Sequence, residues 1–397
     1  MTLTLDKFPV DVLAGSKFLI RRHDEIFSSI SLNFLKELSL ALIKQKNKEY
    51  PEIQALGFWL RERNLKKFLK KYVDDRKRIG LGYVYHITPS NIPTNFAYSF
   101  IFGLVSGNSN IVKISGKQSI QVDIIINTIK KLLSKKKFKE LNNSNLFIRY
   151  QNDDEVNKFL SENCEARVIW GGNETINFFR KYKIGYRTRE INFPDRFSIS
   201  IINAKKMTQL KDNELEVLVK NFYNDTFLVD QNACSSPRLI VWYKSKPNDG
   251  RRKFWSKLYE KVSDYDLNNS LNFEKYTILC NILSRGQVKL ASKLNDSKIY
   301  LTKINSLKNI VFLSNLKLGI FTEYCTNSIE DIFKIDVSAL QTLSYFGFKK
   351  EELLDVFNKN KKRSIDRIVP IGSTLEMDMD WDGFAVPHIL SRIVNIK

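Results

Sequence analysis

Two loops of this sequence carry side chains suited to covalent chemistry at a carbonyl carbon. Cys234 stands among small polar residues, in the run Asp-Gln-Asn-Ala-Cys-Ser-Ser-Pro over 230–237, which leaves room around its thiol. Asn91 lies upstream between two prolines, in the run Thr-Pro-Ser-Asn-Ile-Pro over 88–93. A thiol can accept an acyl group, and an amide can donate a hydrogen bond to the oxyanion formed when a carbonyl is attacked. The two loops therefore predict the formation and reduction of a thioester.

The other cysteines and the histidines do not indicate further chemistry. The cysteines lie at least 45 residues apart, which excludes CxxC metal sites and gives no disulfide framework. Three histidines are too few for an attractive zinc site, so no metal centre is predicted. We expect Cys164, Cys280 and Cys325 to be small buried hydrophobic residues, and His86 to pack at a strand end.

The net charge of +21 admits three interpretations. Because the lysines are spread along the chain, we attribute most of the charge to solvated basic faces. A general attraction for anionic ligands such as CoA or NADPH comes second. Binding to nucleic acid or to an anionic membrane comes last, and we predict no nucleic-acid partner.

The sequence shows neither a secretion signal nor a membrane span. Its first residues lack the basic start and apolar run of a signal peptide. The most apolar stretch, 96–105, is much shorter than the roughly 20 residues that a membrane-spanning helix needs. With cysteines spaced as in a reducing compartment, these features predict a soluble cytoplasmic protein.

Hydrophobic spacing divides the chain into a helical start and a region of alternating strands and helices. Apolar residues recur at helical spacing up to about residue 75. The strands predicted after that point are 81–87, 110–114, 146–150, 167–170, 198–202 and 239–242. The helices between them are predicted at 96–106, 120–133, 155–163 and from 174 onward. This alternation is typical of a doubly wound parallel sheet, which binds ligands at the carboxyl ends of its strands.

The usual nucleotide-binding fingerprints are absent. No GxGxxG occurs, and Gly116-Lys117 lacks the upstream glycine of a P-loop. Even so, three loops fall at the expected carboxyl ends of strands, namely 88–93, 113–117 and 171–172. A dinucleotide fold without its glycine fingerprint narrows the choice of family.

Several segments resemble the aldehyde dehydrogenase superfamily, whose cofactor fold also lacks GxGxxG. They are its Pro-x-Asn-x-Pro loop at 89–93, its Gly-Asn…Val-x-Lys strand at 107–113 and its Gln-x-x-Cys motif at 231–234. The runs His-Ile-Thr-Pro-Ser-Asn, Trp-Gly-Gly-Asn-Glu and Asn-Ala-Cys-Ser-Ser-Pro more closely resemble the LuxC-type acyl-CoA reductases. So do the runs Asp-Arg-Ile-Val-Pro-Ile-Gly and Trp-Asp-Gly near the end of the chain. This resemblance spans about residue 80 to the C-terminus.

The resemblance implies an α/β protein with an aldehyde dehydrogenase-like fold. A doubly wound Rossmann-type cofactor domain would be joined to an α/β catalytic domain that carries the nucleophilic cysteine. We expect the N-terminal helical region of the cofactor domain at 1–78 and the NAD(P)-binding α/β domain at 79–203. The catalytic domain with Cys234 would cover 204–365, and a segment folding back on the body would cover 366–397.

The resemblance also implies roles for individual residues. Cys234 would be the acyl-accepting nucleophile, and Asn91 would donate its side-chain amide to the oxyanion beside the Cys234 backbone N–H. Lys113 would bind the adenosine ribose, while Gly171 and Gly172 would begin a helix whose N-terminus faces the pyrophosphate. The full set of implied cofactor-binding residues is Thr88, Pro89, Ser90, Lys113, Ser115, Lys117, Gly171 and Gly172, of which Ser115 and Lys117 would lie near the 2′-phosphate of NADPH.

One departure from the superfamily bears on the direction of the reaction. Members that hydrolyse their thioester carry a glutamate base in a Glu-x-Gly-Gly segment before the cysteine. The corresponding stretch here, 191–198, places Phe193 near the glutamate position. A site without that base protects the thioester from water and favours its reduction. Glu190 and Asp195 lie close enough in sequence that either remains a candidate base.

The implied activity is NADPH-dependent reduction of an acyl-CoA or acyl-protein thioester to an aldehyde through an acyl-cysteine intermediate. The alternatives are an aldehyde-oxidising dehydrogenase, an acyl-phosphate-reducing dehydrogenase, or a basic non-catalytic binding protein on a dead reductase fold. The expected partner is acyl-CoA or a protein loaded by an acyl-activating synthetase, and we expect a homo-oligomer. The sequence leaves open the acyl chain length, the donor, the pathway and the choice between NADPH and NADH.

Overall fold

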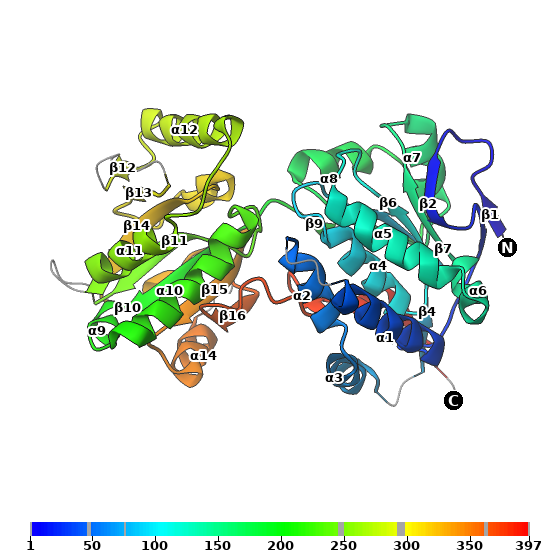
Figure 1. Ribbon diagram of the computed structural model, residues 1–397, viewed down its shortest axis with the longest axis horizontal. Helices are drawn as coiled ribbons and strands as arrows, with labels where there is room; N and C mark the ends of the chain where they lie inside the picture. The colour runs from blue at the N-terminus through cyan, green and yellow to red at the C-terminus, as the bar shows by residue number, and fades with distance from the viewer. Residues whose placement is uncertain are drawn as a thin grey trace. The chain divides into compact units, whose positions relative to one another are not determined.

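The computed structural model describes residues 2–45, 49–74, 77–244, 250–291, 298–360 and 364–395. The chain forms two compact units (Figure 1). The first unit comprises Met1–Pro194 and Met377–Lys397, and the second comprises Asp195–Glu376. The chain therefore leaves the first unit once and returns to it once.

The first unit is built on a six-stranded sheet. Its strand order is β2-β7-β6-β5-β8-β9, and all neighbours are parallel except β2, which runs antiparallel to β7. The central strands β5 and β8 are buried along their whole length, as expected for a parallel sheet covered on both faces. The strands are β2 Asp11–Gly15, β5 Tyr83–Ile87, β6 Ser109–Lys113, β7 Asn145–Arg149, β8 Ala166–Trp170 and β9 Arg189–Phe193.

Helices cover both faces of this sheet, so the predicted doubly wound arrangement is confirmed (Figure 1). One face is covered by α1 Ser29–Lys44, α2 Pro51–Trp59, α3 Glu62–Tyr72, α4 Asn95–Val105 and α5 Ile120–Leu133. The opposite face is covered by α7 Asp154–Glu162 and α8 Asn173–Arg180. Between α5 and β7 lie the short η1 Lys136–Phe138 and α6 Lys139–Asn142.

The prediction of a helical start is wrong for residues 2–20, although α1, α2 and α3 confirm it further on. The chain begins with β1 Thr2–Thr4, β2 and β3 Phe18–Ile20, of which β1 and β3 pair antiparallel. Gly15 explains the local turn, because it has φ +87° and a Cβ there would lie 1.8 Å from the carbonyl oxygen of Asn145. Only glycine permits so close an approach of β2 to its neighbour.

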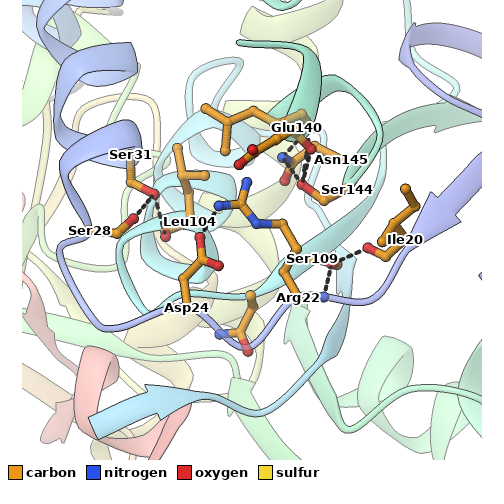
Figure 2. A network of polar contacts seen from close by, with 12 residues as sticks. Ile20, Arg22, Asp24, Ser28, Ser31, Leu104, Ser109, Glu140, Ser144 and Asn145 are labelled. Carbon is orange, nitrogen blue, oxygen red and sulfur yellow. Dashed lines mark hydrogen bonds and ion pairs between the residues drawn. The ribbon is translucent and has the colours of Figure 1, made fainter. Parts of the chain in front are cut away.

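A polar network joins the N-terminal segment to the start of β6 (Figure 2). The backbone N–H of Arg22 donates to the Ser109 hydroxyl at 2.9 Å, and that hydroxyl donates to the carbonyl of Ile20 at 2.8 Å. Nearby, the Ser31 hydroxyl donates to the carbonyl of Leu104 at 3.3 Å. These bonds lie at the amino ends of the strands, away from the edge where ligands are expected.

The second unit contains a seven-stranded sheet of order β12-β13-β14-β11-β10-β15-β16. All neighbours are parallel except β12, which runs antiparallel to β13. Strand β10, expected at the end of the first series, lies in this second sheet between β11 and β15. The strands are β10 Phe197–Asn203, β11 Pro237–Tyr243, β12 Lys289–Leu290, β13 Tyr300–Lys303, β14 Ile320–Thr326, β15 Leu340–Phe346 and β16 Arg367–Pro370.

Helices also cover both faces of the second sheet. One hydrophobic core lies beneath α9 Ala204–Met207, α10 Asp212–Thr226 and α11 Gly250–Lys261. The other lies beneath α12 Asn269–Ser284, η3 Ile310–Asn315, α13 Glu330–Phe333 and α14 Lys350–Lys359. No helix in the described parts of the chain is long and apolar enough to cross a bilayer.

The C-terminal segment completes the first unit. A hairpin of β17 Asp380–Trp381 and β18 Phe384–Ala385 precedes the short helix α15 Val386–Ile389. The last strand, β19 Ser391–Ile393, pairs antiparallel with β4 Arg78–Gly80. The Trp59 indole N–H donates to the carbonyl of Met377 at 2.7 Å, which anchors the point of return.

His86 lies in the middle of a buried hydrogen-bond chain of the first unit. Its Nε2 lies 3.0 Å from Asn110 Oδ1, an acceptor, so Nδ1 accepts from the Ser99 hydroxyl at 2.7 Å. The Ser99 oxygen accepts from the Trp170 indole at 2.9 Å, and the Asn110 amide donates to Asn145 Oδ1 at 2.7 Å. Burial lowers the pKa of His86 to about 4, although the bond to Asn110 acts in the opposite direction.

We predict that His86 makes folding sensitive to acid between about pH 6.5 and pH 4. The unfolded chain protonates this histidine below its usual pKa of 6.5, whereas the folded chain excludes the proton until about pH 4, so stability falls as the pH falls. The contribution lost between pH 7 and pH 5 is about 2 kcal/mol. Urea unfolding of wild type and His86→Gln at the two pH values should show that difference.

Asp225 has the opposite pH dependence, because burial raises its pKa to about 6 and its contribution to stability grows as the pH falls. Asp225 is present in both wild type and His86→Gln, so the difference between the two proteins cancels its contribution. His388→Gln is the matched control and should keep the pH dependence of wild type. Equal pH dependence in wild type and His86→Gln would contradict the prediction.

Candidate active site

The loop that carries Cys234 lies between the short helix η2 Phe227–Val229 and strand β11. Asp230 and Gln231 both adopt the left-handed conformation, with φ of 49° and 57°. The Gln231 backbone N–H donates to the carbonyl of Thr226 at 2.7 Å, and that of Asn232 donates to Val229 at 2.8 Å. This tight turn reverses the chain just before it enters the sheet.

The side chain of Gln231 fixes this turn to two strands. It is 1% exposed, and its amide nitrogen donates to the carbonyls of Pro237 at 2.9 Å and Ile320 at 3.3 Å. Its amide oxygen accepts from the backbone N–H of Gly319 at 3.0 Å. The glutamine of the Gln-x-x-Cys motif is therefore the residue that attaches the cysteine loop to β11 and β14.

Two serine hydroxyls hold the cysteine itself in place. Ser198, on the central strand β10, donates to the carbonyl of Cys234 at 2.7 Å and accepts from the backbone N–H of Thr342 at 3.2 Å. Ser236 donates to the backbone carbonyl of Asp225 in α10 at 2.7 Å. The backbone around Cys234 is thus attached to three neighbouring elements, while its side chain stays half-buried.

Arg238 lies at the start of β11, four residues after the cysteine, and is 4% exposed. Its guanidinium donates to three backbone carbonyls: Leu316 at 2.6 Å, Arg196 at 2.9 Å and Gln231 at 3.4 Å. No sequence motif indicated this residue. A charged residue immediately before the predicted strand 239–242 was the available signal.

The other cysteines differ from Cys234 in their surroundings. Cys164 is buried as expected, and burial raises the pKa of its thiol to about 12. The expectation of burial is wrong for Cys280 and Cys325, which are exposed. Cys280 lies on the outer face of α12, and Cys325 lies near the end of β14, where it contacts Arg251 Nη1 at 3.6 Å.

The loop with Asn91 joins β5 to α4 in the first unit. Thr88 is anchored to β6, because its hydroxyl and its backbone N–H both donate to the carbonyl of Lys113, at 2.6 and 3.3 Å. Pro89 is half-buried, while Ser90 and Asn91 are exposed. The structure thus places the predicted oxyanion donor at the carboxyl edge of the first sheet, and Cys234 in the second unit.

Lys113 ends β6 on the face covered by α7 and α8. Its Nζ donates to Asn152 Oδ1 at 3.1 Å and lies 4.7 Å from the ring centre of Tyr150 and 5.5 Å from that of Phe179. Burial lowers the pKa of Lys113. Its ammonium group is therefore held at the expected cofactor edge by aromatic rings and one amide.

The loop after Lys113 carries the two residues predicted near a 2′-phosphate. The Lys117 backbone N–H donates to the Ser115 hydroxyl at 3.2 Å, and Lys117 itself is exposed. Arg149, which no sequence motif indicated, ends the neighbouring strand β7 on the opposite face of the sheet. Its Nε and Nη2 are buried without a hydrogen-bond partner, and its ion pair with Asp123 is long, at 3.9 Å.

Gly171 and Gly172 lie between β8 and α8, as predicted. Gly172 is the N-cap of α8, and a Cβ on Gly171 would lie 2.8 Å from the side chain of Thr175. The close approach explains a glycine at this turn. The preceding Trp170 packs against Phe193, with ring centres 3.9 Å apart.

Glu190, one of the two candidate bases, belongs to an ion-pair network of the first unit. Its carboxylate pairs with Arg167 and with Arg180, the latter at 3.3 Å, and accepts from the Asn192 amide at 2.8 Å. Burial alone would raise the pKa of Glu190, but the bonds from Asn192 and Arg167 outweigh it, so the pKa is lowered. Asp195, the other candidate, is exposed and begins the second unit.

We predict that Glu190 stabilises the first unit and does not act as a base. Replacing Glu190 by Gln leaves the buried Arg167 charge without its carboxylate, so the free energy of unfolding should fall by about 3 kcal/mol. The rate of Cys234 alkylation should remain that of wild type. Chemical denaturation and alkylation kinetics measure the two quantities. Unchanged stability together with slower alkylation would contradict this assignment.

Solved structures with the same fold are aldehyde dehydrogenases. Lactaldehyde dehydrogenase from Escherichia coli has a TM-score of 0.63 and 11% identity, covering 92% of this chain and 86% of that one. Glyceraldehyde-3-phosphate dehydrogenase from Methanocaldococcus jannaschii, complexed with NADP, has a TM-score of 0.62 and 16% identity. The match covers 92% of this chain and 88% of that one. 1-Pyrroline-5-carboxylate dehydrogenase from Thermus, with bound NAD, has a TM-score of 0.63 and 10% identity. The match covers 91% of this chain and 77% of that one. At such identities the likeness establishes the fold, which is the predicted one.

The sequence comparison is more specific. No curated protein matches the chain significantly. The family model described as acyl-CoA reductase (LuxC) matches residues 52–267, more than half of the 397 residues. The resemblance drawn from the motifs is confirmed, and the chain belongs to the acyl-CoA reductase (LuxC) family, among the oxidoreductases of aldehyde chemistry.

Proposed function

We propose that this protein reduces an acyl thioester to an aldehyde, with Cys234 as the acyl-carrying nucleophile and NADPH as the reductant. The observation that carries the proposal is the loop around Cys234. Its backbone is fixed by Gln231, Ser198 and Ser236, while the thiol remains half-buried. Such fixation positions a nucleophile without covering it. The family match supports the same activity.

The proposed reaction begins with attack of the Cys234 thiolate on the carbonyl carbon of acyl-CoA or an acyl-protein thioester. A new C–S bond forms, and the donor thiolate leaves with the electron pair of the broken bond. The Asn91 amide and the Cys234 backbone N–H would donate to the oxyanion. NADPH, when bound, supplies a hydride to the acyl carbon. Collapse of the resulting thiohemiacetal releases the aldehyde and returns Cys234 as a thiolate.

The first unit offers groups that fit a dinucleotide phosphate. Lys113 and Arg149 bring positive charge to the carboxyl edge of the sheet from its two faces. The buried Nε and Nη2 of Arg149, which lack hydrogen-bond partners, would gain hydrogen bonds from a phosphate, and exposed Lys117 lies in the adjoining loop. Thr88, Pro89 and Ser90 would line the same edge. The turn of Gly171 and Gly172 would leave room for the pyrophosphate at the start of α8.

The surroundings of Phe193 favour reduction over hydrolysis. Phe193 is buried against Trp170, and the nearest upstream carboxylate, Glu190, is engaged by Arg167 and Arg180. An acyl-cysteine that lacks the hydrolytic glutamate of the superfamily resists attack by water and persists until hydride reaches it. This supports an aldehyde-forming direction.

The acyl donor is proposed to be acyl-CoA or an acyl group carried by a partner protein that an acyl-activating synthetase loads. A homo-oligomeric state and a cytoplasmic location complete the proposal. Each rests on the family resemblance and on the spacing of the cysteines.

We predict that Cys234→Ala abolishes NADPH oxidation driven by a panel of acyl-CoAs of different chain lengths. Without the thiol no acyl-enzyme forms, so the rate should fall roughly a thousandfold or more. Cys280→Ala, which removes an exposed thiol, is the matched control and should retain full activity. Radiolabelled acyl-CoA should label wild type but not Cys234→Ala. Aldehyde formation by Cys234→Ala at the wild-type rate would sink the proposal.

We predict that Arg149→Gln and Lys117→Gln each raise KM for NADPH by about tenfold, equal to about 1.4 kcal/mol, and leave KM for NADH nearly unchanged. The reason is the loss of a cation facing the 2′-phosphate. Steady-state kinetics with both cofactors give the comparison. Lys130→Gln, at the exposed far end of α5, is the matched control. Equal effects on both cofactors would show that these cations do not read the 2′-phosphate.

A further inference from the structure

Arg238 differs from the other deeply buried arginines in its partners. Arg167 is paired with Glu190, and Arg196 is paired with Asp366. Arg238 is equally buried, yet among the described residues no carboxylate forms a salt bridge with it. Its three hydrogen bonds all go to neutral carbonyls, of Leu316, Arg196 and Gln231.

Neutral carbonyls satisfy the donors of a guanidinium but do not neutralise its charge. A cation taken out of water without an opposite charge is costly, so an anion beside Arg238 is favoured. Burial lowers the pKa of Arg238, and the negative charges that act against this effect are those of Cys234, when ionised, and Asp195. Asp195 is exposed and therefore screened by water, whereas Cys234 is half-buried.

We propose that Arg238 is the buried positive charge that keeps Cys234 as a thiolate. Interaction between two charges is reciprocal, so an arginine stabilised by the thiolate stabilises the thiolate equally. The same side chain donates to the carbonyl of Gln231 and so holds the loop in which the cysteine lies. Arg238 is thus a positioning residue for the nucleophile. The inference rests on the proposed function only where it connects the thiolate to acyl transfer.

Two neighbouring cations, Arg196 and Lys317, are engaged by other partners. Arg196, whose carbonyl accepts from Arg238, directs its own guanidinium to Asp366 and to the carbonyl of Leu340. Lys317, next to Leu316, pairs with Glu274 at 2.6 Å on the surface. Arg238 is therefore the buried cation that is attached to the cysteine loop, through its bond to the carbonyl of Gln231.

This arrangement gives a reaction that needs no histidine base. The thiolate attacks directly, the C–S bond forms, and the negative charge leaves with the thiolate of the donor. Arg238 then lacks its counter-charge until the thiohemiacetal breaks down. Expulsion of the aldehyde restores the Cys234 thiolate, and the same cation stabilises this leaving group.

The test is the pH dependence of Cys234 alkylation by iodoacetamide. A background with Cys280→Ser and Cys325→Ser removes the exposed thiols, and Cys164 is buried. In Arg238→Gln the midpoint pH of alkylation should rise by one unit or more. Alkylation should therefore be about tenfold slower on the acidic side, while the rate at high pH should reach the same plateau. Arg238→Lys should keep most of the wild-type midpoint.

Ser198→Ala is the matched control, because it removes a support of the same loop without removing a charge. Its midpoint should equal that of wild type. A wild-type midpoint in folded Arg238→Gln, verified by circular dichroism, would overturn the proposal and leave Arg238 as a purely structural support. So would an upward shift of equal size in Ser198→Ala.

A second measurement uses the wild-type arginine and holds if Arg238→Gln does not fold. Cys234 is modified either by iodoacetate, which leaves a negative adduct, or by iodoacetamide, which leaves a neutral one. The negatively charged adduct should have the higher Tm, and equal or reversed Tm values would overturn the proposal. Neither measurement requires acyl-CoA or NADPH, so the absence of reductase turnover would count against the proposed function alone.

Discussion

The side-chain amide of Gln231 is the interaction on which the candidate nucleophile depends. Its nitrogen donates to the carbonyls of Pro237 and Ile320, and its oxygen accepts from the backbone N–H of Gly319. The side chain is buried from water. A shorter or apolar side chain would leave these three backbone groups unsatisfied, each at a cost of about 1–3 kcal/mol. The left-handed turn at 230–231 is held by these bonds, and the position of Cys234 follows from that turn.

The buried arginines of this molecule differ in how completely their charge is neutralised. Arg167 and Arg196 have carboxylate partners and connect elements within their own units. Arg238 donates only to backbone carbonyls, and Arg149 lies 3.9 Å from its nearest carboxylate oxygen, on Asp123. Both arginines lie beside residues proposed to bind substrate or cofactor. A buried cation that the fold leaves incompletely neutralised is able to accept an anion later. The net charge of the chain does not show this distinction, because it counts paired and unpaired cations alike.

The sequence predicted the alternating elements well, because covered parallel strands are continuous apolar runs bounded by turn residues. Helix α5 was placed at its observed bounds, and the loops at 88–93 and 171–172 fall where expected. The first 20 residues were misread because strands as short as β1 and β3 carry little periodic signal. Cys280 and Cys325 were misplaced because their exposure depends on what packs on α12 and β14. Arg238 and Arg149 were missed for a related reason, since an incompletely neutralised cation is recognised only when its neighbours are known.

The antiparallel pair of β19 and β4 joins the two sequence segments of the first unit, which are separated by the whole second unit. The second unit is continuous in sequence, from Asp195 to Glu376, whereas the first also requires residues from Met377 onward. During synthesis the second unit therefore has all of its strands before the first does. The first unit, although its sequence starts earlier, also needs residues that are synthesised after the whole second unit, so its assembly must wait for them.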